Sequence, residues 1–165
     1  MKCFGSLLMV FVAITCGQVA AQDNNKENEA AEEQAVRIMV EAKQFVFVAQ
    51  SAKPMKGRSL QLTGSAVAIS PGAVASNLPY FGRVYSGAAY NTEESGISFS
   101  STEFEYKSEE RKKGGWNITI RPKDVRNRPT MSMTIQKNGY ALLNVSFTDR
   151  ESISYNGYVE APKGK

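Results

Sequence analysis

The sequence predicts an α+β fold, in which an N-terminal helix packs on a curved, mainly antiparallel β-sheet that is sandwich-like or barrel-like. Three observations support this. Residues 27–43 are strong helix formers without glycine or proline. After Pro54 the chain is rich in β-branched and aromatic residues, separated by turn sequences. No later segment is long enough for a second crossover helix, which argues against parallel βαβ units.

The expected helix runs from about Glu27 to Lys43 and is amphipathic. Its small and apolar residues recur at helical spacing: Ala31, Ala35, Ile38 and Ala42. At Phe45-Val46-Phe47-Val48 the composition becomes β-branched and aromatic, so we expect the helix to give way to a strand there.

The expected sheet has roughly six to eight strands, a usual size for an antiparallel domain. Turns such as Ser70-Pro71-Gly72 and Lys113-Gly114-Gly115 separate them. After the strand at Phe45, the candidate strands are Leu60–Ile69, Gly96–Tyr106, Trp116–Arg121, Met131–Gln136, Tyr140–Thr148 and Ser152–Val159.

One hairpin can be predicted to its register. A two-residue turn at Asn138-Gly139 would divide the apolar residues between both faces of the sheet. A three-residue loop, Lys137 to Gly139, pairs Gln136 with Tyr140 and gathers the apolar residues on one face: Met131, Met133, Ile135, Ala141, Leu143, Val145 and Phe147. Since a one-residue slip inverts every side chain, burial favours the three-residue loop, with Gly139 at positive φ. The same alternation predicts that Trp116, Ile118, Ile120, Ile153 and Tyr155 face the core.

The first residues resemble an export signal. Lys2 precedes an apolar run from Phe4 to about Thr15, and small residues follow at Val19-Ala20-Ala21. The run is too short for a bilayer span, which takes roughly 20 residues. We therefore expect cleavage after Ala21 and a periplasmic or secreted protein without a transmembrane span in its mature chain.

The domain boundaries follow from this interpretation. Residues 1–21 form the signal peptide, residues 22–28 a polar tether, residues 29–160 a single α+β domain, and residues 161–165 a tail. Cys16 offers an alternative, because lipoprotein signals place a lipidated cysteine just after the apolar run. In that case the protein is an outer-membrane lipoprotein anchored at Cys16. Thr15 stands where such signals prefer glycine, alanine or serine, which favours the cleaved, soluble form.

The composition excludes several kinds of chemistry. The chain has no histidine, and its two cysteines, Cys3 and Cys16, lie within the expected signal peptide. Ser-His-Asp and Cys-His catalysis, histidine-ligated metals and the usual zinc sites are thereby excluded. We expect no catalytic residue, no metal and no cofactor. Carboxylate chemistry remains as an alternative, because Glu103 and Glu105 have the i, i+2 spacing that places side chains on one side of a strand. Asp149 and Glu151 flank Arg150 at a predicted turn.

The segment from Asn77 to Tyr90 contains the candidate binding residues. Four aromatic residues and one arginine lie among glycines and a proline, between two expected strands: Tyr80, Phe81, Arg83, Tyr85 and Tyr90. Flat rings and a guanidinium are typical of carbohydrate and peptide sites. The alternative is a packed, irregular segment whose aromatic side chains fill the open end of a curved sheet.

The charge distribution suggests a second candidate surface. The chain has a formal net charge of +4, and an acidic N-terminal stretch precedes a basic body. The loop from Arg121 to Pro129 and the cluster Arg111-Lys112-Lys113 are basic. Such clusters are typical of solubilising hairpin tips; anionic polysaccharide or lipid head groups are the alternative. In an exported protein we do not expect nucleic acid as a partner.

Three stretches resemble a known family. They are Leu78-Pro79-Tyr80-Phe81-Gly82-Arg83-x-Tyr85, Ser95-Gly96-Ile97-x-Phe99 and Arg150-Glu151-Ser152-Ile153-Ser154-Tyr155-x-Gly157. Together they are similar to a family of uncharacterised exported proteins of Bacteroidetes, a domain of unknown function. The resemblance extends from about Phe45 to Val159. It implies a signal-bearing chain with one α/β domain and transfers no activity.

Three functions remain from the sequence. The first is a non-enzymatic binding or interaction module of the bacterial cell envelope, whose partner is an envelope polysaccharide, peptide or protein. The second is a histidine-free hydrolase that uses paired carboxylates. The third is a structural envelope protein with no small ligand.

Overall fold

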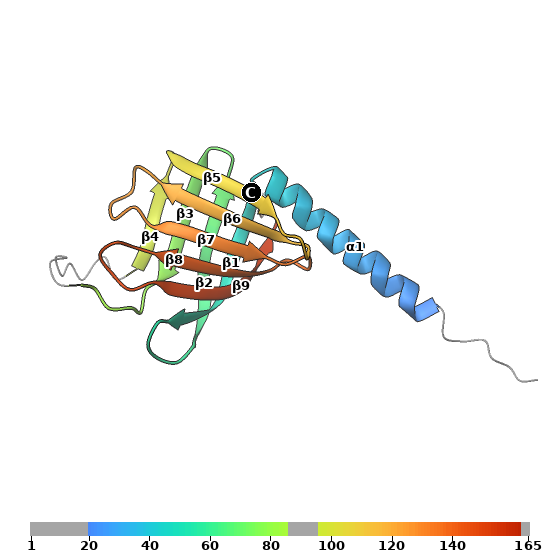
Figure 1. Cartoon of the computed structure of the whole chain (residues 1–165), viewed down its shortest axis with the longest axis horizontal. Coiled ribbons are helices and arrows are strands. Elements are labelled where there is room, and N and C mark those ends of the chain that lie inside the picture. Colours follow the sequence, from blue (N-terminus) through green and yellow to red (C-terminus); the bar gives the residue numbers. More distant parts are fainter. Residues whose placement is uncertain (1–19, 86–95, 163–165) are drawn as a thin grey trace, which may run out of the picture.

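The computed structural model describes residues 20–85 and 96–162, with side chains from Asn28 onward. Within these residues one helix precedes nine strands (Figure 1). Their bounds are α1 (Ala20–Glu41), β1 (Phe45–Pro54), β2 (Leu60–Ser70), β3 (Ala73–Pro79), β4 (Gly96–Ser101), β5 (Phe104–Glu110), β6 (Trp116–Pro122), β7 (Thr130–Ile135), β8 (Tyr140–Ser146) and β9 (Ile153–Glu160).

The nine strands of the described residues form one antiparallel sheet in the order β4-β3-β2-β1-β9-β8-β7-β6-β5. The strands from β1 to β4 form one layer, and those from β5 to β9 form a second layer that crosses it (Figure 1). The edges are β4 and β5, and the chain passes directly from one to the other, so that the sheet is nearly closed. The fold is mostly β and barrel-like, with one N-terminal helix, as the sequence predicts in outline.

The structure corrects the expected strands in two places. The segment Gly96–Tyr106, expected as one strand, divides into β4 and β5 at Thr102-Glu103. The carboxylate of Asp124 accepts the backbone N–H groups of both corner residues, at 2.9 and 3.3 Å, and so satisfies donors that a continuous strand would pair. β3 has no counterpart among the expected strands, because the residues from Asn77 to Pro79 fall in the segment expected as a loop. Within the described residues, nine strands therefore replace the six to eight expected.

The hairpin between β7 and β8 has the predicted register. Ile135 pairs with Ala141 and Met133 with Leu143. The N–H of Gln136 donates to the carbonyl of Tyr140 at 2.8 Å, which closes the three-residue loop. Gly139 has a φ of 81°, a left-handed value that glycine adopts without steric penalty. Burial of one apolar face therefore determines the pairing, as expected.

The core lies between the two layers of the sheet. Its largest fully buried side chains come from both layers: Phe45, Phe47 and Ile69 from β1 and β2, Leu78 from β3, Ile118 and Ile120 from β6, Met131, Met133 and Ile135 from β7, Leu143 from β8, and Ile153 and Tyr155 from β9. Trp116 is also buried. The alternation of buried and exposed residues along β6, β7 and β8 confirms the core faces that the sequence predicts.

The helix α1 begins earlier and ends slightly earlier than expected. It starts at Ala20, so residues 22–28, expected as a polar tether, are helical. No glycine or proline occurs between Ala20 and Glu41 to interrupt it. At the other end Lys43 has a φ of 52°. The N–H of Gln44 donates to the carbonyl of Met39 and that of Lys43 to the carbonyl of Val40, which is a Schellman cap.

The C-terminal half of α1 closes one end of the barrel, and its N-terminal half extends away from it (Figure 1). Val36 and Val40 are buried, and the carbonyl of Val40 accepts the hydroxyl of Tyr106 at 3.2 Å. Ion pairs join Arg37 to Glu110 at 3.0 Å and Glu33 to Lys137 at 2.9 Å. Since exposed ion pairs contribute little, the two valines supply most of the attachment.

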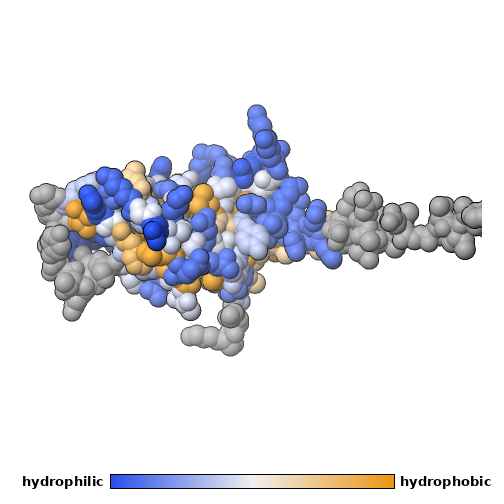
Figure 2. All heavy atoms as spheres, turned by 90° about the horizontal axis from the view of Figure 1, so that it is seen from below, coloured by the Kyte–Doolittle hydropathy of each residue, from blue (hydrophilic) through white to orange (hydrophobic). Residues whose placement is uncertain are grey.

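The surface of the described residues is mixed in character. Figure 2 shows the underside of the barrel, where hydrophobic patches are separated by hydrophilic side chains, and α1 is mainly hydrophilic. No helix within the described residues is long and apolar enough to cross a membrane.

A β-bulge lies on β1, where the layer of β1 to β4 meets the layer of β5 to β9. The register of β1 shifts between Ala49 and Ser51 against both neighbouring strands. Opposite the bulge, Gly157 of β9 pairs with Ala49. A Cβ at Gly157 would overlap the carbonyl oxygen of Val48, so only glycine allows the two backbones to approach this closely.

We expect Gly157→Ala to lower the free energy of unfolding by more than about 2 kcal/mol, because the added methyl group forces β1 and β9 apart at the bulge. Gly72→Ala is the control, since a Cβ there meets no atom within 4 Å. Its change should stay within about 0.5 kcal/mol. Urea denaturation of both variants measures the difference, and equal midpoints would contradict the role assigned to Gly157.

Candidate functional site at the mouth of the barrel

Two segments meet at the end of the barrel opposite α1 (Figure 1). One follows β3 and contains residues 80–85, and the other joins β8 to β9. The N–H of Tyr85 donates to the carbonyl of Asp149 and the N–H of Glu151 to the carbonyl of Arg83, both at 2.9 Å. Val84 and Arg150 thus form an isolated antiparallel bridge. These bonds hold residues 83–85 in a defined position although they lie outside the main sheet.

Arg150 lies against two aromatic rings at this end. Its guanidinium carbon is 5.3 Å from the ring centre of Tyr80 and 5.2 Å from that of Phe147. The two rings meet edge to face, with centres 5.8 Å apart. Arg150 is only 9% exposed, and its ion pair with Asp149 spans 3.3 Å. Partial burial strengthens both kinds of contact.

Tyr80 holds this arrangement together. Its hydroxyl donates to the carbonyl of Glu151 at 2.8 Å and lies 3.1 Å from that of Arg83. Burial raises the pKa of Tyr80 to about 12, so the hydroxyl stays protonated and remains a donor at neutral pH. Gly82 packs on the ring, where a Cβ would overlap the Tyr80 side chain. Tyr80 therefore has a structural role.

A second tyrosine supports the same segment from the core. The hydroxyl of the buried Tyr155 donates to the carbonyl of Pro79 at 2.6 Å. Burial raises the pKa of Tyr155 as well, so this donor also persists at neutral pH. The chain thus leaves β3 in a fixed direction.

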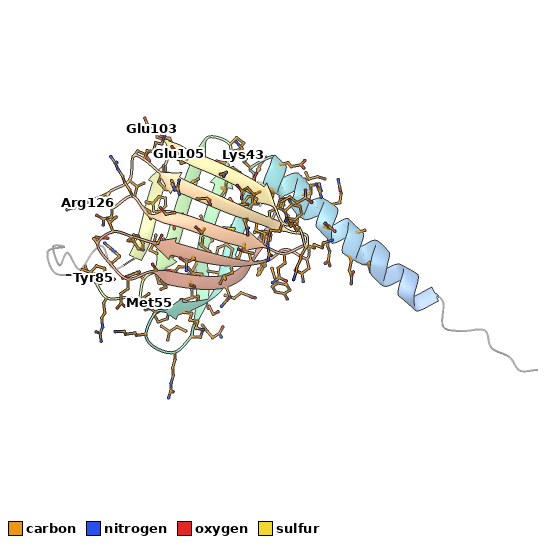
Figure 3. The ribbon with its side chains drawn as sticks, viewed as in Figure 1. Lys43, Met55, Tyr85, Glu103, Glu105 and Arg126 are labelled. Carbon is orange, nitrogen blue, oxygen red and sulfur yellow. The ribbon has the colours of Figure 1, made fainter. Side chains whose placement is uncertain are left out.

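The structure divides the predicted binding residues into two groups. Tyr80 is half-buried, whereas Phe81 is 44% exposed and Tyr85 is 54% exposed. Arg83 is also exposed, and Tyr85 points away from the barrel (Figure 3). Tyr90 lies outside the described residues. The packed alternative therefore describes Tyr80, while Phe81, Arg83 and Tyr85 form an outward surface, which we call the aromatic tip.

A cavity of about 160 Å³, which the sequence does not predict, lies beside this cluster. Its walls come from β4, the loop between β6 and β7, and the segment after β8, and include Gly96, Ser98, Phe99, Arg126, Asn127 and Arg150. Asn127 and Arg128 have φ values of 66° and 34°, unusual for residues other than glycine. The only signals in the sequence were the basic loop and the presence of Arg150 in one of the stretches that resemble the family. Neither indicates that they meet.

Asp124 fixes the loop that forms one wall. Besides the two corner N–H groups, its carboxylate accepts the hydroxyl of the buried Ser101. This bond, followed by that from the N–H of Thr102, lowers the pKa of Asp124 to about 2. The loop is therefore tied to the corner between β4 and β5 at all pH values near neutrality.

The prediction that Glu103 and Glu105 lie together on one strand is wrong. Glu103 lies at the corner before β5, and Glu105 lies on β5, so the two do not share one strand. Glu105 pairs with Lys123 at 2.9 Å, and this hydrogen bond lowers the pKa of Glu105. A general acid needs a raised pKa, which this environment does not supply. Figure 3 shows both glutamates at the top of the barrel, away from Tyr85.

The other two acidic candidates, Asp149 and Glu151, stabilise the loops at the mouth of the barrel. Asp149 pairs with Arg150, and the buried Glu151 accepts the N–H of Arg83 at 3.4 Å. Within residues 20–85 and 96–162, no group of three or more acidic, cysteine or histidine side chains is placed to hold a metal ion.

Comparison with known proteins places the chain in a family. A model of a domain of unknown function (DUF4251) matches residues 27–159. The chain belongs to this family. The crystal structure of a DUF4251 family protein from Bacteroides eggerthii DSM 20697 is similar, with a TM-score of 0.63 and 13% sequence identity. The likeness covers 82% of this chain and 91% of that chain, and at this identity it shows a shared fold. No curated protein matches the sequence significantly.

We expect Tyr80→Ala to lower the free energy of unfolding by about 3 kcal/mol, because it removes a packed ring and the carbonyl of Glu151 loses the hydroxyl that donates to it. Tyr85→Ala should change it by no more than about 0.5 kcal/mol, since that ring is exposed. Tyr140→Ala is a matched control, with its ring 56% exposed on β8. Urea denaturation tests this. A large loss for Tyr85→Ala would show that the aromatic tip is part of the packing.

Proposed function

We propose that this DUF4251 family member is an exported, non-enzymatic binding or interaction module of the bacterial cell envelope. The aromatic tip, formed by Phe81, Arg83 and Tyr85, is its proposed binding surface. The partner is an envelope polysaccharide, peptide or protein. One observation carries the proposal: exposed aromatic side chains stand on a backbone that is fixed by hydrogen bonds to another loop.

The fixed backbone matters because ordering a loop on binding costs free energy. Immobilising a flexible side chain alone costs about 0.5–1.5 kcal/mol, and a mobile backbone adds more. In this protein the bonds of Tyr85 to Asp149 and of Arg83 to Glu151 hold the tip in place without a ligand. Tyrosine and phenylalanine provide large contact areas with few rotatable bonds. Because these side chains are exposed, they contribute little to folding, which supports a role in recognition.

Export is supported by the sequence of residues 1–21, with its lysine, short apolar run and small residues before the expected cleavage point. The likeness to a Bacteroides protein supports a bacterial origin. We propose a soluble periplasmic or secreted form, with lipidation of Cys16 as the alternative.

Expression in a Bacteroides host followed by intact-protein mass spectrometry tests the export proposal. The expected mature protein begins at Gln22 and fractionates with the soluble periplasm or the medium. A lipid-modified N-terminus at Cys16, with membrane fractionation that Cys16→Ser abolishes, would establish the lipoprotein instead. A full-length chain in the cytoplasm would contradict both.

The binding proposal is tested by co-sedimentation with insoluble cell-wall material from the same host. The double variant Phe81→Ala/Tyr85→Ala should reduce the bound fraction at least about fivefold, a loss of roughly 1 kcal/mol by the relation between affinity and free energy. Tyr140→Ala should bind like the unaltered protein, because it removes an equally exposed ring from another face. Equal losses for both would indicate non-specific adhesion and would reject the aromatic tip.

A further inference from the structure

Among the described residues, one wall of the cavity at the mouth is a strand edge without a pairing partner. β4 pairs with β3 on one side and is an outer strand of the described sheet on the other. Four consecutive residues of β4, from Gly96 to Phe99, line the cavity. Among the described residues no backbone hydrogen bond closes that side of β4 between Gly96 and Ser100. An extended ligand placed in the cavity would therefore run along a strand.

The pairing of β3 with β4 indicates which backbone groups face outward. Pro79 pairs with Gly96 but has no N–H, so these two residues cannot exchange two hydrogen bonds. Because hydrogen-bonded and non-hydrogen-bonded pairs alternate along an antiparallel ladder, Leu78 and Ile97 form a hydrogen-bonded pair. The next pair, Asn77 with Ser98, is then a non-hydrogen-bonded pair, so the N–H and C=O of Ser98 point away from β3.

The two edges of the sheet differ in their protection. β5 presents charged side chains along its length, with ion pairs from Lys107 to Glu109 and from Lys123 to Glu105. Charges of this kind discourage another strand from pairing. The exposed side chains of β4 are the small hydroxyls of Ser98 and Ser100. The β4 edge therefore lacks the side-chain protection that the β5 edge has.

The cavity also has a positive end. The described residues that line it include Arg126 and Arg150, and none of the described lining residues is acidic. Arg150 donates to Asp149 through Nε and Nη2, at 3.4 and 3.3 Å. Among the described residues Nη1 has no hydrogen-bond partner, and no buried side-chain nitrogen lacks one, so Nη1 remains accessible. A nitrogen of this largely buried guanidinium is thus available to an anion.

Strand polarity connects the edge with the arginine. A peptide that pairs antiparallel with β4 runs from Ser100 toward Gly96, so its carboxyl end lies near Gly96. Gly96 pairs with Pro79, and the next residue, Tyr80, contacts Arg150. Antiparallel pairing thus brings a terminal carboxylate to the side of the cavity where the guanidinium lies.

We propose that this cavity binds the C-terminal residues of an extended peptide, whose backbone pairs with β4 at Ser98 and whose carboxylate binds Arg150. The inference goes beyond the binding surface proposed above, because the residues of the aromatic tip do not line this cavity. Strand addition to an exposed edge and capture of a terminal carboxylate are both established modes of peptide recognition. A polysaccharide carboxylate would use Arg150 but gain nothing from the strand edge, so the observations favour a peptide. With about 30 Å³ per water, the cavity has room for a terminal carboxylate and a small side chain.

The test is a titration of the ¹⁵N-labelled protein, followed by NMR, with a mixture of N-acetylated tetrapeptides that have free C-terminal carboxylates. The same mixture with C-terminal amides is the control ligand. We expect saturable shifts at the amides of Gly96 and Ser98 and at Nε of Arg150 at millimolar peptide. The amide mixture should bind about tenfold more weakly, because it lacks the charge that Arg150 recognises.

Three variants separate the two contacts. Ser98→Pro removes the outward N–H and should weaken binding about tenfold, in a position where an edge strand tolerates proline. Arg150→Lys keeps the positive charge but loses the fork of the guanidinium, and should reduce the preference for the carboxylate. Arg121→Gln removes an exposed positive charge from β6 and should bind like the unaltered protein.

The outcomes are distinct from those of the cell-wall experiment. Equal affinity for acid and amide peptides, full binding by Ser98→Pro, or the absence of saturable shifts from either mixture overturns the peptide site. Binding to a glucuronate-rich polysaccharide that Arg150→Lys weakens and Ser98→Pro does not would replace the peptide by a sugar. Co-sedimentation that depends on Phe81 and Tyr85 would stand in each case, because those side chains do not line the cavity.

Discussion

The pairing of β1 with β9 is the constraint on which the rest of the described structure depends. Every other pair in the sheet joins strands that follow one another in the chain, as hairpins or short connections do. Only β1 and β9 bring the two ends of the domain together, and they join the layer of β1 to β4 with that of β5 to β9. The loop-closure entropy of that long-range contact must be offset by burial of the core. A substitution that disturbs the pairing of β1 with β9, such as one that adds a side chain at Gly157, therefore affects both layers.

The sequence could predict those parts of the fold that a local pattern determines. In the β7–β8 hairpin, burial on one face leaves a single register, and Gly139 then follows from the loop length. Where a distant group decides, the prediction failed. Asp124 lies 22 residues after Thr102, and no alternation in the strand itself reveals that its carboxylate will turn the chain there. The helix was predicted, but its start was missed for a local reason, because the polar composition of residues 22–28 is compatible with both a tether and a helix.

At the mouth, the same limit appears among the aromatic residues. Tyr80 and Tyr85 look equivalent in the sequence, but one is held under Gly82 and against Arg150, while the other points to solvent. The difference arises from the segment after β8, about 70 residues away, which supplies the carbonyl of Glu151 to Tyr80. The stretches that carry the family resemblance thus meet in space. Several of their residues, including Gly82 and Gly157, serve the packing, so these stretches are informative about the fold rather than about a ligand.

The two ends of the barrel are closed in different ways, and this difference bears on function. At one end α1 lays Val36 and Val40 over the core, and its ion pairs lie at the exposed rim. At the other end no helix covers the described residues; loops, two aromatic rings and a largely buried arginine close it. Burying an arginine at this end costs free energy, since its charge must be paired and its guanidinium hydrogen-bonded. A leucine would fill the same space without that demand. Asp149 and the two rings meet part of this demand, and the proposed recognition of an anion at the mouth gives a further reason for an arginine at this position.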